Sequence, residues 1–145
     1  MNKPIAVLLA GAVLLAGTVR AQDAQSAQDP AAVSAATESA TRWLALADAG
    51  KSGETWDQAA PALQAAVTKA VWSNTADAGR KALGAVKSRK LQSATFTHTL
   101  PGAPAGDYVV IQYATEFTNK PQSAETVVPM KLPDGSWKVS GYFIR

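Results

Sequence analysis

The stretch that most constrains the fold is residues 106–120, GDYVVIQYATEFTNK, the longest run rich in β-branched and aromatic residues. Such residues favour strands, and turn-forming residues bound the run on both sides. A strand of this kind needs strand neighbours and a covering layer over its apolar face. We therefore expect the rest of the chain to supply a sheet around this strand and helices that cover one face of it.

Strict alternation along this strand separates two faces. The more apolar face carries Val109, Ile111, Tyr113 and Phe117, and we predict that it meets the helices. Glu116 falls on the opposite face. Tyr113 is the one residue of the apolar face with a polar tip, so it is the first residue to consider for a pocket.

The first predicted helix starts at Asp29-Pro30 and runs to about residue 49. An aspartate accepts the free N–H groups of a first helical turn, and proline suits the first helical position. Gly50 is placed to end this helix. Its apolar line has helical spacing and consists of Val33, Ala36, Ala40, Trp43, Leu44 and Ala47.

Two further helical segments follow. One begins at Ser52 or at Thr55, where the sequence fits a Thr-x-x-Gln capping box, and Pro61 should kink it or start it anew. The next covers about residues 68–83. The residues that we expect to face inward from it are Val71, Trp72, Thr75 and Gly79.

After these helices the apolar period changes from that of a helix to that of a strand. Besides the central strand, we predict a first strand within residues 85–100, best defined over 91–99, and strands over 123–132 and 137–145, joined by hairpin-length turns. Pro129 cannot donate to a ladder, so its strand should be an edge or carry a bulge. The predicted fold is α+β, one domain over residues 30–145, with N-terminal helices packed on one face of a curved four-stranded antiparallel meander.

The N-terminus has the pattern of an export signal. Lys3 gives a positive start, residues 5–17 form a short apolar core, and small residues precede a cleavage site after Ala21. We therefore expect residues 1–21 to be a signal peptide, residues 22–29 a flexible lead-in, and the mature protein to be periplasmic. The alternative is an uncleaved N-terminal anchor.

Composition excludes several kinds of chemistry. The chain has no cysteine, which excludes disulfides, thiolate catalysis, cysteine-based metal sites and a lipid-modified N-terminal cysteine. The net charge of +3 includes Lys3 and Arg20, which leave with the signal peptide, so a nucleic-acid partner is not expected. No second apolar run is long enough to cross a membrane. We expect a small molecule or a protein of the cell envelope as partner; the sequence leaves the oligomeric state open.

Several short motifs occur in order from about residue 40 to the end of the chain. They are Trp43-Leu44-Ala45-Leu46, Asp48-Ala49-Gly50, Thr55-Trp56-Asp57-Gln58-Ala59-Ala60, Trp72, Arg80, Leu83-Gly84, Leu100-Pro101-Gly102-Ala103-Pro104, Gly106-Asp107-Tyr108, Asp134-Gly135-Ser136-Trp137 and Gly141-Tyr142-Phe143-Ile144. In these the chain resembles the exported bacterial family named domain of unknown function 4019, although Lys81-Ala82 stands where that family more often has a proline. The resemblance implies a cone of helices and curved sheet like that of nuclear transport factor 2, and no established activity.

Few residues suggest catalysis. His98 is the sole histidine, and with no acidic residue two positions away it is expected to be exposed or hydrogen-bonded in place. Glu54 and Asp57 form a carboxylate pair or simply suit the positive end of a helix. The sequence has no Ser/His/Asp order, no metal-ligand spacing and no phosphate-binding loop. We therefore predict no catalytic residue, no metal and no cofactor.

A basic run has no intervening acidic residue and consists of Arg80, Lys81, Lys87, Arg89 and Lys90. It is a solvated face or a contact for an anionic surface. Arg80, at a helix end, either binds a ligand carboxylate or pairs within the fold, with Glu116 or Asp107, or caps the helix.

The four tryptophans, Trp43, Trp56, Trp72 and Trp137, are core anchors or part of a stacking pocket. We select Arg80, Tyr113 and Trp72 as ligand-binding residues. The function that we expect is that of a non-catalytic ligand-binding or protein-interaction module. The alternatives are an enzyme that uses a pocket between helices and sheet, with Arg80, Glu116, Tyr113 or His98 as its polar groups, and a peripheral module held to an anionic membrane surface by the basic run.

Overall fold

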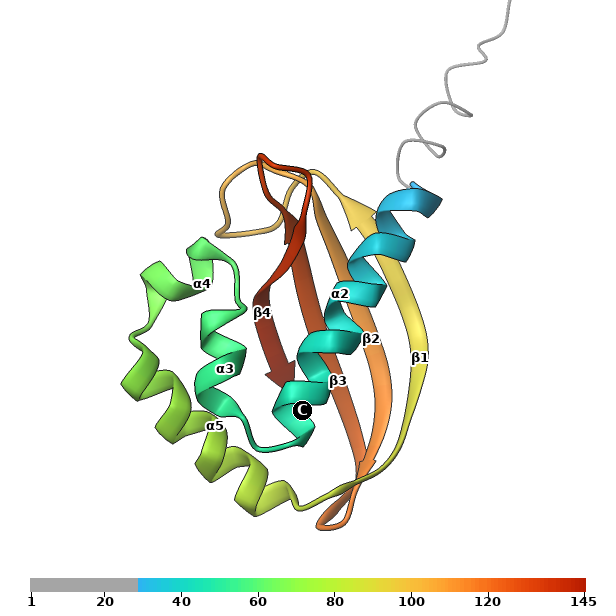
Figure 1. Ribbon diagram of the computed structural model, residues 1–145. Helices are drawn as coiled ribbons and strands as arrows, with labels where there is room; N and C mark the ends of the chain where they lie inside the picture. Colours follow the sequence, from blue (N-terminus) through green and yellow to red (C-terminus); the bar gives the residue numbers. More distant parts are fainter. Residues whose placement is uncertain (1–28) are drawn as a thin grey trace, which may run out of the picture.

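The computed structural model describes residues 29–145, so the predicted signal peptide and nearly all of the predicted lead-in lie outside the described residues. Helices come first and strands second, which confirms the predicted α+β class (Figure 1). The elements are α2 (Pro30–Asp48), α3 (Ser52–Asp57), α4 (Pro61–Ala66), α5 (Lys69–Leu83), β1 (Val86–Thr97), β2 (Tyr108–Phe117), β3 (Lys120–Lys131) and β4 (Trp137–Ile144).

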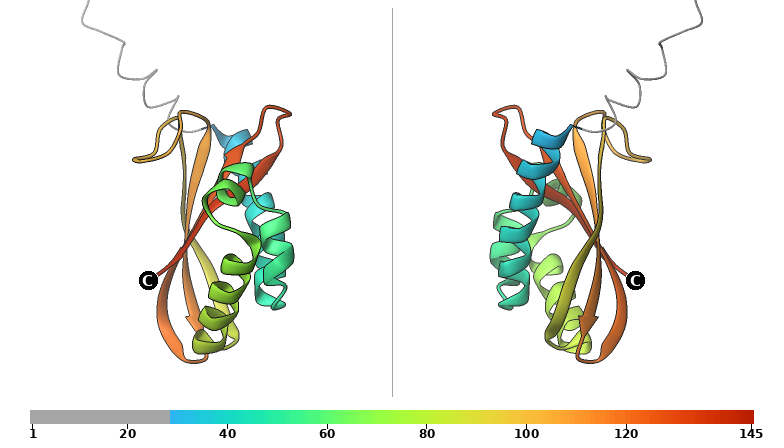
Figure 2. Two further views of the ribbon diagram at one scale, coloured as in Figure 1. Left: turned by 90° about the vertical axis from the view of Figure 1, so that its left-hand side faces the viewer. Right: turned by 90° about the vertical axis from the view of Figure 1, so that its right-hand side faces the viewer.

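The four strands form one antiparallel meander in the order β1-β2-β3-β4. The sheet is curved and open, and Figure 2 shows the described helices together on one side of it. The long helix α2 crosses this face, while α3, α4 and α5 lie beside it near β4 (Figure 1). None of the described helices is both long enough and apolar enough to cross a membrane.

Helix α2 begins where the sequence predicts. The Asp29 carboxylate accepts hydrogen bonds from the backbone N–H groups of Ala31 and Ala32, both at 3.1 Å. Gly50 follows the helix with a φ of +73°, a conformation that suits glycine. Five residues of the predicted apolar line are buried: Ala36, Ala40, Trp43, Leu44 and Ala47.

Two details of the middle helices differ from expectation. Helix α3 starts at Ser52, one of the two predicted starts, so the capping box at Thr55 is wrong: Thr55 lies inside the helix, and its hydroxyl donates to the Ser52 carbonyl at 2.6 Å. Pro61 occupies the first turn of a separate helix, α4, as one of the two predicted alternatives had it. Val71, predicted to face inward from α5, is 56 % exposed, because α5 lies chiefly on α3 and turns a different face inward.

The central strand has the predicted polarity. Val109, Ile111 and Phe117 are fully buried and Tyr113 nearly so. Strand β3 lies between β2 and β4, so it is not an edge; its pairing with β4 shifts register between Val128 and Pro129, which confirms the bulge alternative.

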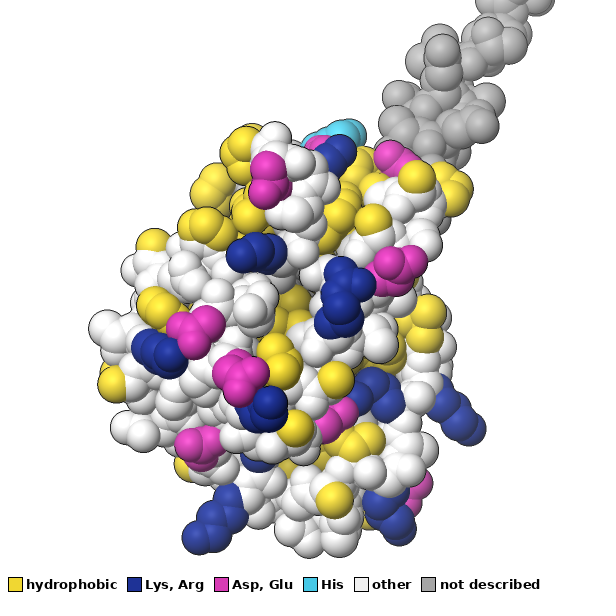
Figure 3. All heavy atoms as spheres, viewed as in Figure 1, with side chains coloured by type: hydrophobic (Ala, Val, Ile, Leu, Met, Phe, Trp, Pro, Cys, Tyr) yellow, Lys and Arg dark blue, Asp and Glu magenta, His cyan; other side chains and the backbone are white. Residues whose placement is uncertain are grey.

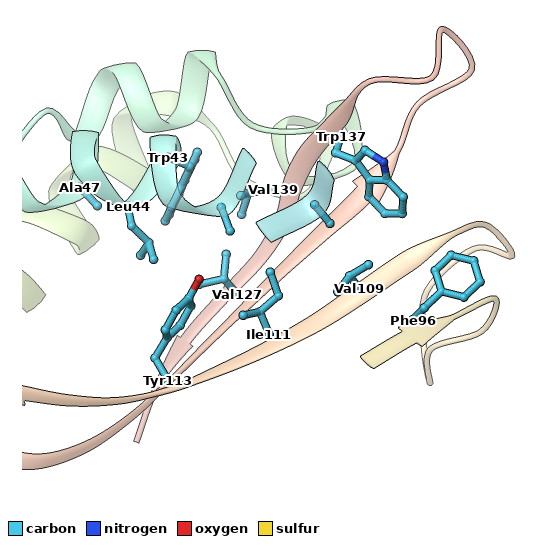
Figure 4. Packing of buried hydrophobic residues seen from close by; sticks show 12 residues of the cluster. Trp43, Leu44, Ala47, Phe96, Val109, Ile111, Tyr113, Val127, Trp137 and Val139 are labelled. Atoms are coloured by element: carbon cyan, nitrogen blue, oxygen red, sulfur yellow. The ribbon is translucent and has the colours of Figure 1, made fainter. Parts of the chain in front are cut away.

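The core lies between α2 and the inner face of the sheet (Figure 4). Side chains from α2 meet residues of all four strands. In Figure 4, Val109, Ile111 and Tyr113 point from β2 toward the helix layer, and Tyr113 is the one nearest Leu44 and Ala47 of α2. Burial of these apolar side chains contributes roughly 25 cal/mol for each Å² removed from water, and it fixes α2 on the sheet.

Candidate functional site

A cavity of about 430 Å³ opens between α5 and the end of the sheet formed by β3 and β4. Its walls are mostly apolar, with a few polar groups among them. The lining residues are Trp43, Ala47, Ser52, Thr55, Trp72, Thr75, Ala76, Gly79, Arg80, Ala82, Leu83, Lys120, Tyr142 and Ile144. The volume lies within the range of about 300–1,000 Å³ that is usual for small-molecule sites.

The placement of α5 creates this space. Helix α5 has no fully buried residue, and it is held by contacts with the neighbouring helix α3. Lys69 pairs with Asp57 at 2.6 Å, and Trp72 Nε1 donates to Thr55 Oγ1 at 2.9 Å. The face of α5 that borders the cavity includes Gly79, where an added Cβ would meet no atom within 4 Å. A helix held chiefly by α3, with a residue that lacks a side chain on the cavity wall, leaves room between helix and sheet.

Three aromatic side chains form one wall. The Trp43 ring stands edge-on to Trp72, with 6.2 Å between centroids, and edge-on to Tyr142, with 5.1 Å between centroids. Trp43 is also fixed by its indole N–H, which donates to the Thr55 carbonyl at 2.9 Å. The indole N–H groups of both tryptophans are therefore satisfied within the protein, so the rings offer the cavity apolar surface only.

A cluster of charged side chains lies next to the cavity, centred on Arg89 of β1. Arg89 Nε donates to Glu125 Oε1 at 2.7 Å, Nη1 to Asp48 Oδ2 at 2.7 Å, and Nη2 to Asp48 Oδ1 at 3.0 Å. The same Nη2 reaches Glu125 Oε2 at 3.3 Å. Glu125 is fully buried and also accepts hydrogen bonds from the Thr115 and Tyr142 hydroxyls. Arg89 thus joins the end of α2 to β3 across the inner face of β2.

Arg80 of α5 joins the charge cluster from the cavity side. Its Nη1 donates to Asp48 Oδ1 at 2.9 Å, its Nη2 donates to the Tyr142 hydroxyl at 2.8 Å, and it lies 3.9 Å from Glu125 Oε2. The guanidinium also lies 5.6 Å from the centroid of the Phe117 ring. A guanidinium has five N–H donors, so only part of Arg80 is used by hydrogen bonds to the described residues. We call Asp48, Arg80, Arg89, Glu125 and Tyr142 the charge cluster.

Electrostatics fix the protonation states of this cluster. Burial alone raises the pKa of Glu125, but the hydrogen bonds from Arg89, Thr115 and Tyr142 lower that pKa below its ordinary value. The pKa of Asp48 is likewise lowered: burial opposes the shift, and the hydrogen bond and charge of Arg89, then Arg80, outweigh it. Burial, followed by the Glu125 charge, raises the pKa of Tyr142. At neutral pH the two carboxylates are charged, Tyr142 is neutral, and the two arginines balance the two carboxylates.

The structure brings two of the three selected residues together. Arg80 and Trp72 both line the cavity, whereas Tyr113 lies under α2 in the core and not in the cavity lining. Figure 4 shows the Tyr113 ring directed from β2 toward α2. The Tyr113 hydroxyl has no hydrogen-bond partner among the described residues, and burial raises its pKa.

The partners that we had expected for Arg80 within the fold are occupied elsewhere. Glu116 pairs with Lys87 at 3.2 Å on the opposite face of the sheet, and Asp107 contacts His98 Nδ1 at 2.7 Å. Arg80 pairs instead with Asp48 and Glu125 because the end of α5 lies over the inner face. Glu116 and His98 are therefore not part of the cavity.

The basic run does not form one surface. Arg80 and Arg89 turn into the charge cluster and Lys87 has an acidic partner. On the face shown in Figure 3, basic and acidic side chains alternate, with no large area of one sign. Among residues 29–145, no group of three His, Asp or Glu side chains is arranged to hold a metal ion.

Sequence reasoning missed Asp48, Glu125, Tyr142 and Lys120 as residues of this region. A partial signal exists for Glu125. On β3 it shares a face with Val127, and an acidic residue on an apolar face indicates a buried partner. Lys120 pairs with Phe117 across the β2–β3 turn, so it faces the same side as that buried ring.

Fold and cavity together define a small α+β protein in which helices cover one face of an open antiparallel sheet and border a mostly apolar cavity. Residues 39–142 match the family described as "Protein of unknown function (DUF4019)", and the chain belongs to this family. No curated protein and no solved structure matches the chain. The link to nuclear transport factor 2 stays a prediction.

Proposed function

We propose that this protein is an exported ligand-binding module that works in the periplasm without catalysing a reaction, and that the cavity beside α5 is its binding site. The observation that carries the proposal is a mostly apolar cavity of about 430 Å³, with two tryptophans on its wall and Arg80 among its polar groups. Mostly apolar walls with a few oriented polar groups are typical of small-molecule sites.

The electrostatics favour binding over proton transfer. A general acid or base works best with a pKa near the working pH. The pKa of Glu125 is lowered and that of Tyr142 is raised, so both move away from neutrality. The polar groups of this site therefore act as fixed charges and dipoles.

Gly79→Leu tests the binding site directly. The leucine side chain starts from a position with no atom within 4 Å of its Cβ and extends into the cavity. The probe is 2-naphthol, an uncharged flat molecule, titrated against the mature protein by calorimetry and tryptophan fluorescence. We expect the unmodified protein to bind it and Gly79→Leu to lose binding without loss of stability.

Ala78→Leu is the matched control, since residue 78 is exposed on α5 and does not line the cavity. It should bind 2-naphthol like the unmodified protein. Equal binding by Gly79→Leu and Ala78→Leu would refute the cavity as the site.

Export is tested separately. The proposal rests on the signal pattern of residues 1–21. Mass spectrometry of the protein from a fractionated Gram-negative host should find it in the periplasmic fraction with Gln22 as its first residue. Recovery of the chain with an intact N-terminus in the cytoplasm contradicts export.

A further inference from the structure

The charges at one end of the cavity are not balanced. In the charge cluster, the two arginines face two carboxylates. Lys120 also lines the cavity, and it has no carboxylate within 4.0 Å among residues 29–145. The cavity end near Lys120 therefore carries one positive charge that the described residues leave uncompensated.

Lys120 and Arg80 border the same end. Lys120 lies opposite Phe117 in the β2–β3 pairing, and the Arg80 guanidinium lies 5.6 Å from the Phe117 ring centroid. Arg80 is held at both terminal nitrogens, by Asp48 and by the Tyr142 hydroxyl. It keeps N–H donors that no described residue uses, since two of its five are engaged in these bonds.

The rest of the cavity is suited to an apolar body. Trp43, Trp72, Leu83 and Ile144 contribute apolar surface, and the indole N–H groups point to Thr55. A ligand that filled this space with polar groups would leave them without partners, which is costly. The favoured ligand therefore has an apolar body and a polar group at one end only.

We propose that the cavity selects organic monocarboxylates with an apolar, preferably flat body, and that the ligand carboxylate lies at the end formed by Lys120 and Arg80. This rests on the proposed function and names its ligand class. One negative charge matches the single uncompensated positive charge, and the planar carboxylate matches guanidinium donors. A phosphate monoester carries close to two negative charges and exceeds that balance.

The test compares probes of one shape and different charge: 2-naphthoate, 2-naphthol, 2-naphthylmethylammonium and 2-naphthyl phosphate. Calorimetry on the mature protein at neutral pH should give 2-naphthoate the tightest binding, about tenfold or more tighter than 2-naphthol, which is the gain expected from a charge-assisted hydrogen bond. The ammonium probe should bind most weakly.

Lys120→Gln supplies the decisive variant. Lys120 is half-buried and makes no ion pair with the described residues, so its replacement leaves the charge cluster intact. It should weaken 2-naphthoate binding about tenfold and 2-naphthol binding much less, because 2-naphthol carries no charge for Lys120 to pair with. The control is Lys131→Gln, because Lys131 is exposed at the other end of β3 and outside the cavity lining; it should change neither.

The outcomes separate the two proposals. If Gly79→Leu abolishes 2-naphthol binding, but 2-naphthoate binds the unmodified protein no tighter than 2-naphthol or 2-naphthyl phosphate does, the ligand class is wrong and the binding function stands. If Lys120→Gln keeps the full preference for 2-naphthoate, the placement of the carboxylate is wrong. If no probe binds the unmodified protein, both proposals fail.

Discussion

Glu125→Gln is the sharpest test of the charge cluster. Glu125 is fully buried and accepts two hydrogen bonds from Arg89, at 2.7 and 3.3 Å, besides those from Thr115 and Tyr142. Glutamine keeps the size of the side chain but removes its charge, so two arginines face Asp48 alone. Removing one partner of a buried ion pair costs about 3–5 kcal/mol. Asp48 and its solvent contact relieve part of the imbalance, so we expect about 3 kcal/mol of lost unfolding free energy.

The assay is urea denaturation followed by circular dichroism, with thermal unfolding as a second readout. For a chain of 145 residues, about 4 °C per kcal/mol converts this loss to a fall in Tm of about 12 °C. The matched control is Glu116→Gln, whose partner Lys87 lies at 3.2 Å with both side chains about half exposed. An exposed pair of this kind contributes less than about 1 kcal/mol. Equal losses in the two variants would refute the reasoning.

Three further predictions concern the pKa of Glu125, two tyrosines and two glycines. The folded-state pKa of Glu125 is lowered, so the stability that its carboxylate contributes is complete above the unfolded pKa and is lost as pH falls through the folded pKa. The resistance of the unmodified protein to urea should therefore fall more between about pH 5 and pH 2 than that of Glu125→Gln. Tyr113→Phe removes a buried hydroxyl without a described partner and should stabilise by about 1 kcal/mol, whereas Tyr108→Phe removes a 2.7 Å hydrogen bond to a backbone carbonyl and should cost about 1 kcal/mol in the same urea assay. Gly84→Ala should lower Tm, since the residue has a φ of +78° and an added Cβ meets a side-chain carbon at 3.0 Å. Gly79→Ala should raise Tm, because the higher helix propensity of alanine adds up to about 1 kcal/mol to the free energy of unfolding.

The parts of the fold that follow local rules could be predicted from sequence. The Asp29 cap, the helix start at Pro61 and the polarity of β2 depend on residues close together in the chain. The capping box at Thr55 failed because its hydroxyl is used otherwise: it donates to the Ser52 carbonyl and accepts from the Trp72 indole. The prediction that Val71 faces inward is wrong because α5 lies chiefly on α3, and the apolar pattern of one helix does not specify which neighbour it packs on.

The candidate site was predictable in part. Arg80 and Trp72 lie two turns apart on one helix, and their residue types alone suggested a pocket. The charge cluster was not predictable, because it joins residues from two helices and three strands. Arg89 on β1 reaches Glu125 on β3 across the short side chain of Thr115, with which it pairs on β2. A charged residue on a strand is ordinarily solvated. The burial of Glu125 is explained by its ion pair with Arg89, which lies on a strand that is not its neighbour in the sheet.

The two arginines of the charge cluster have different roles. All three guanidinium nitrogens of Arg89 donate to carboxylates, so the role of Arg89 is structural: it links the end of α2 to β3. Stability alone does not require such a cluster, since buried ion pairs are often replaced by apolar residues without loss. Apolar residues would not hold Arg80 at the cavity wall, with both terminal nitrogens fixed and further donors left over. Its rotamer freedom, worth about 0.5–1.5 kcal/mol on binding, is already lost on folding. The side-chain entropy of Arg80 is therefore lost on folding, which leaves a preorganised donor at the cavity wall. Because the charge cluster is itself neutral, it does not compensate the charge of Lys120.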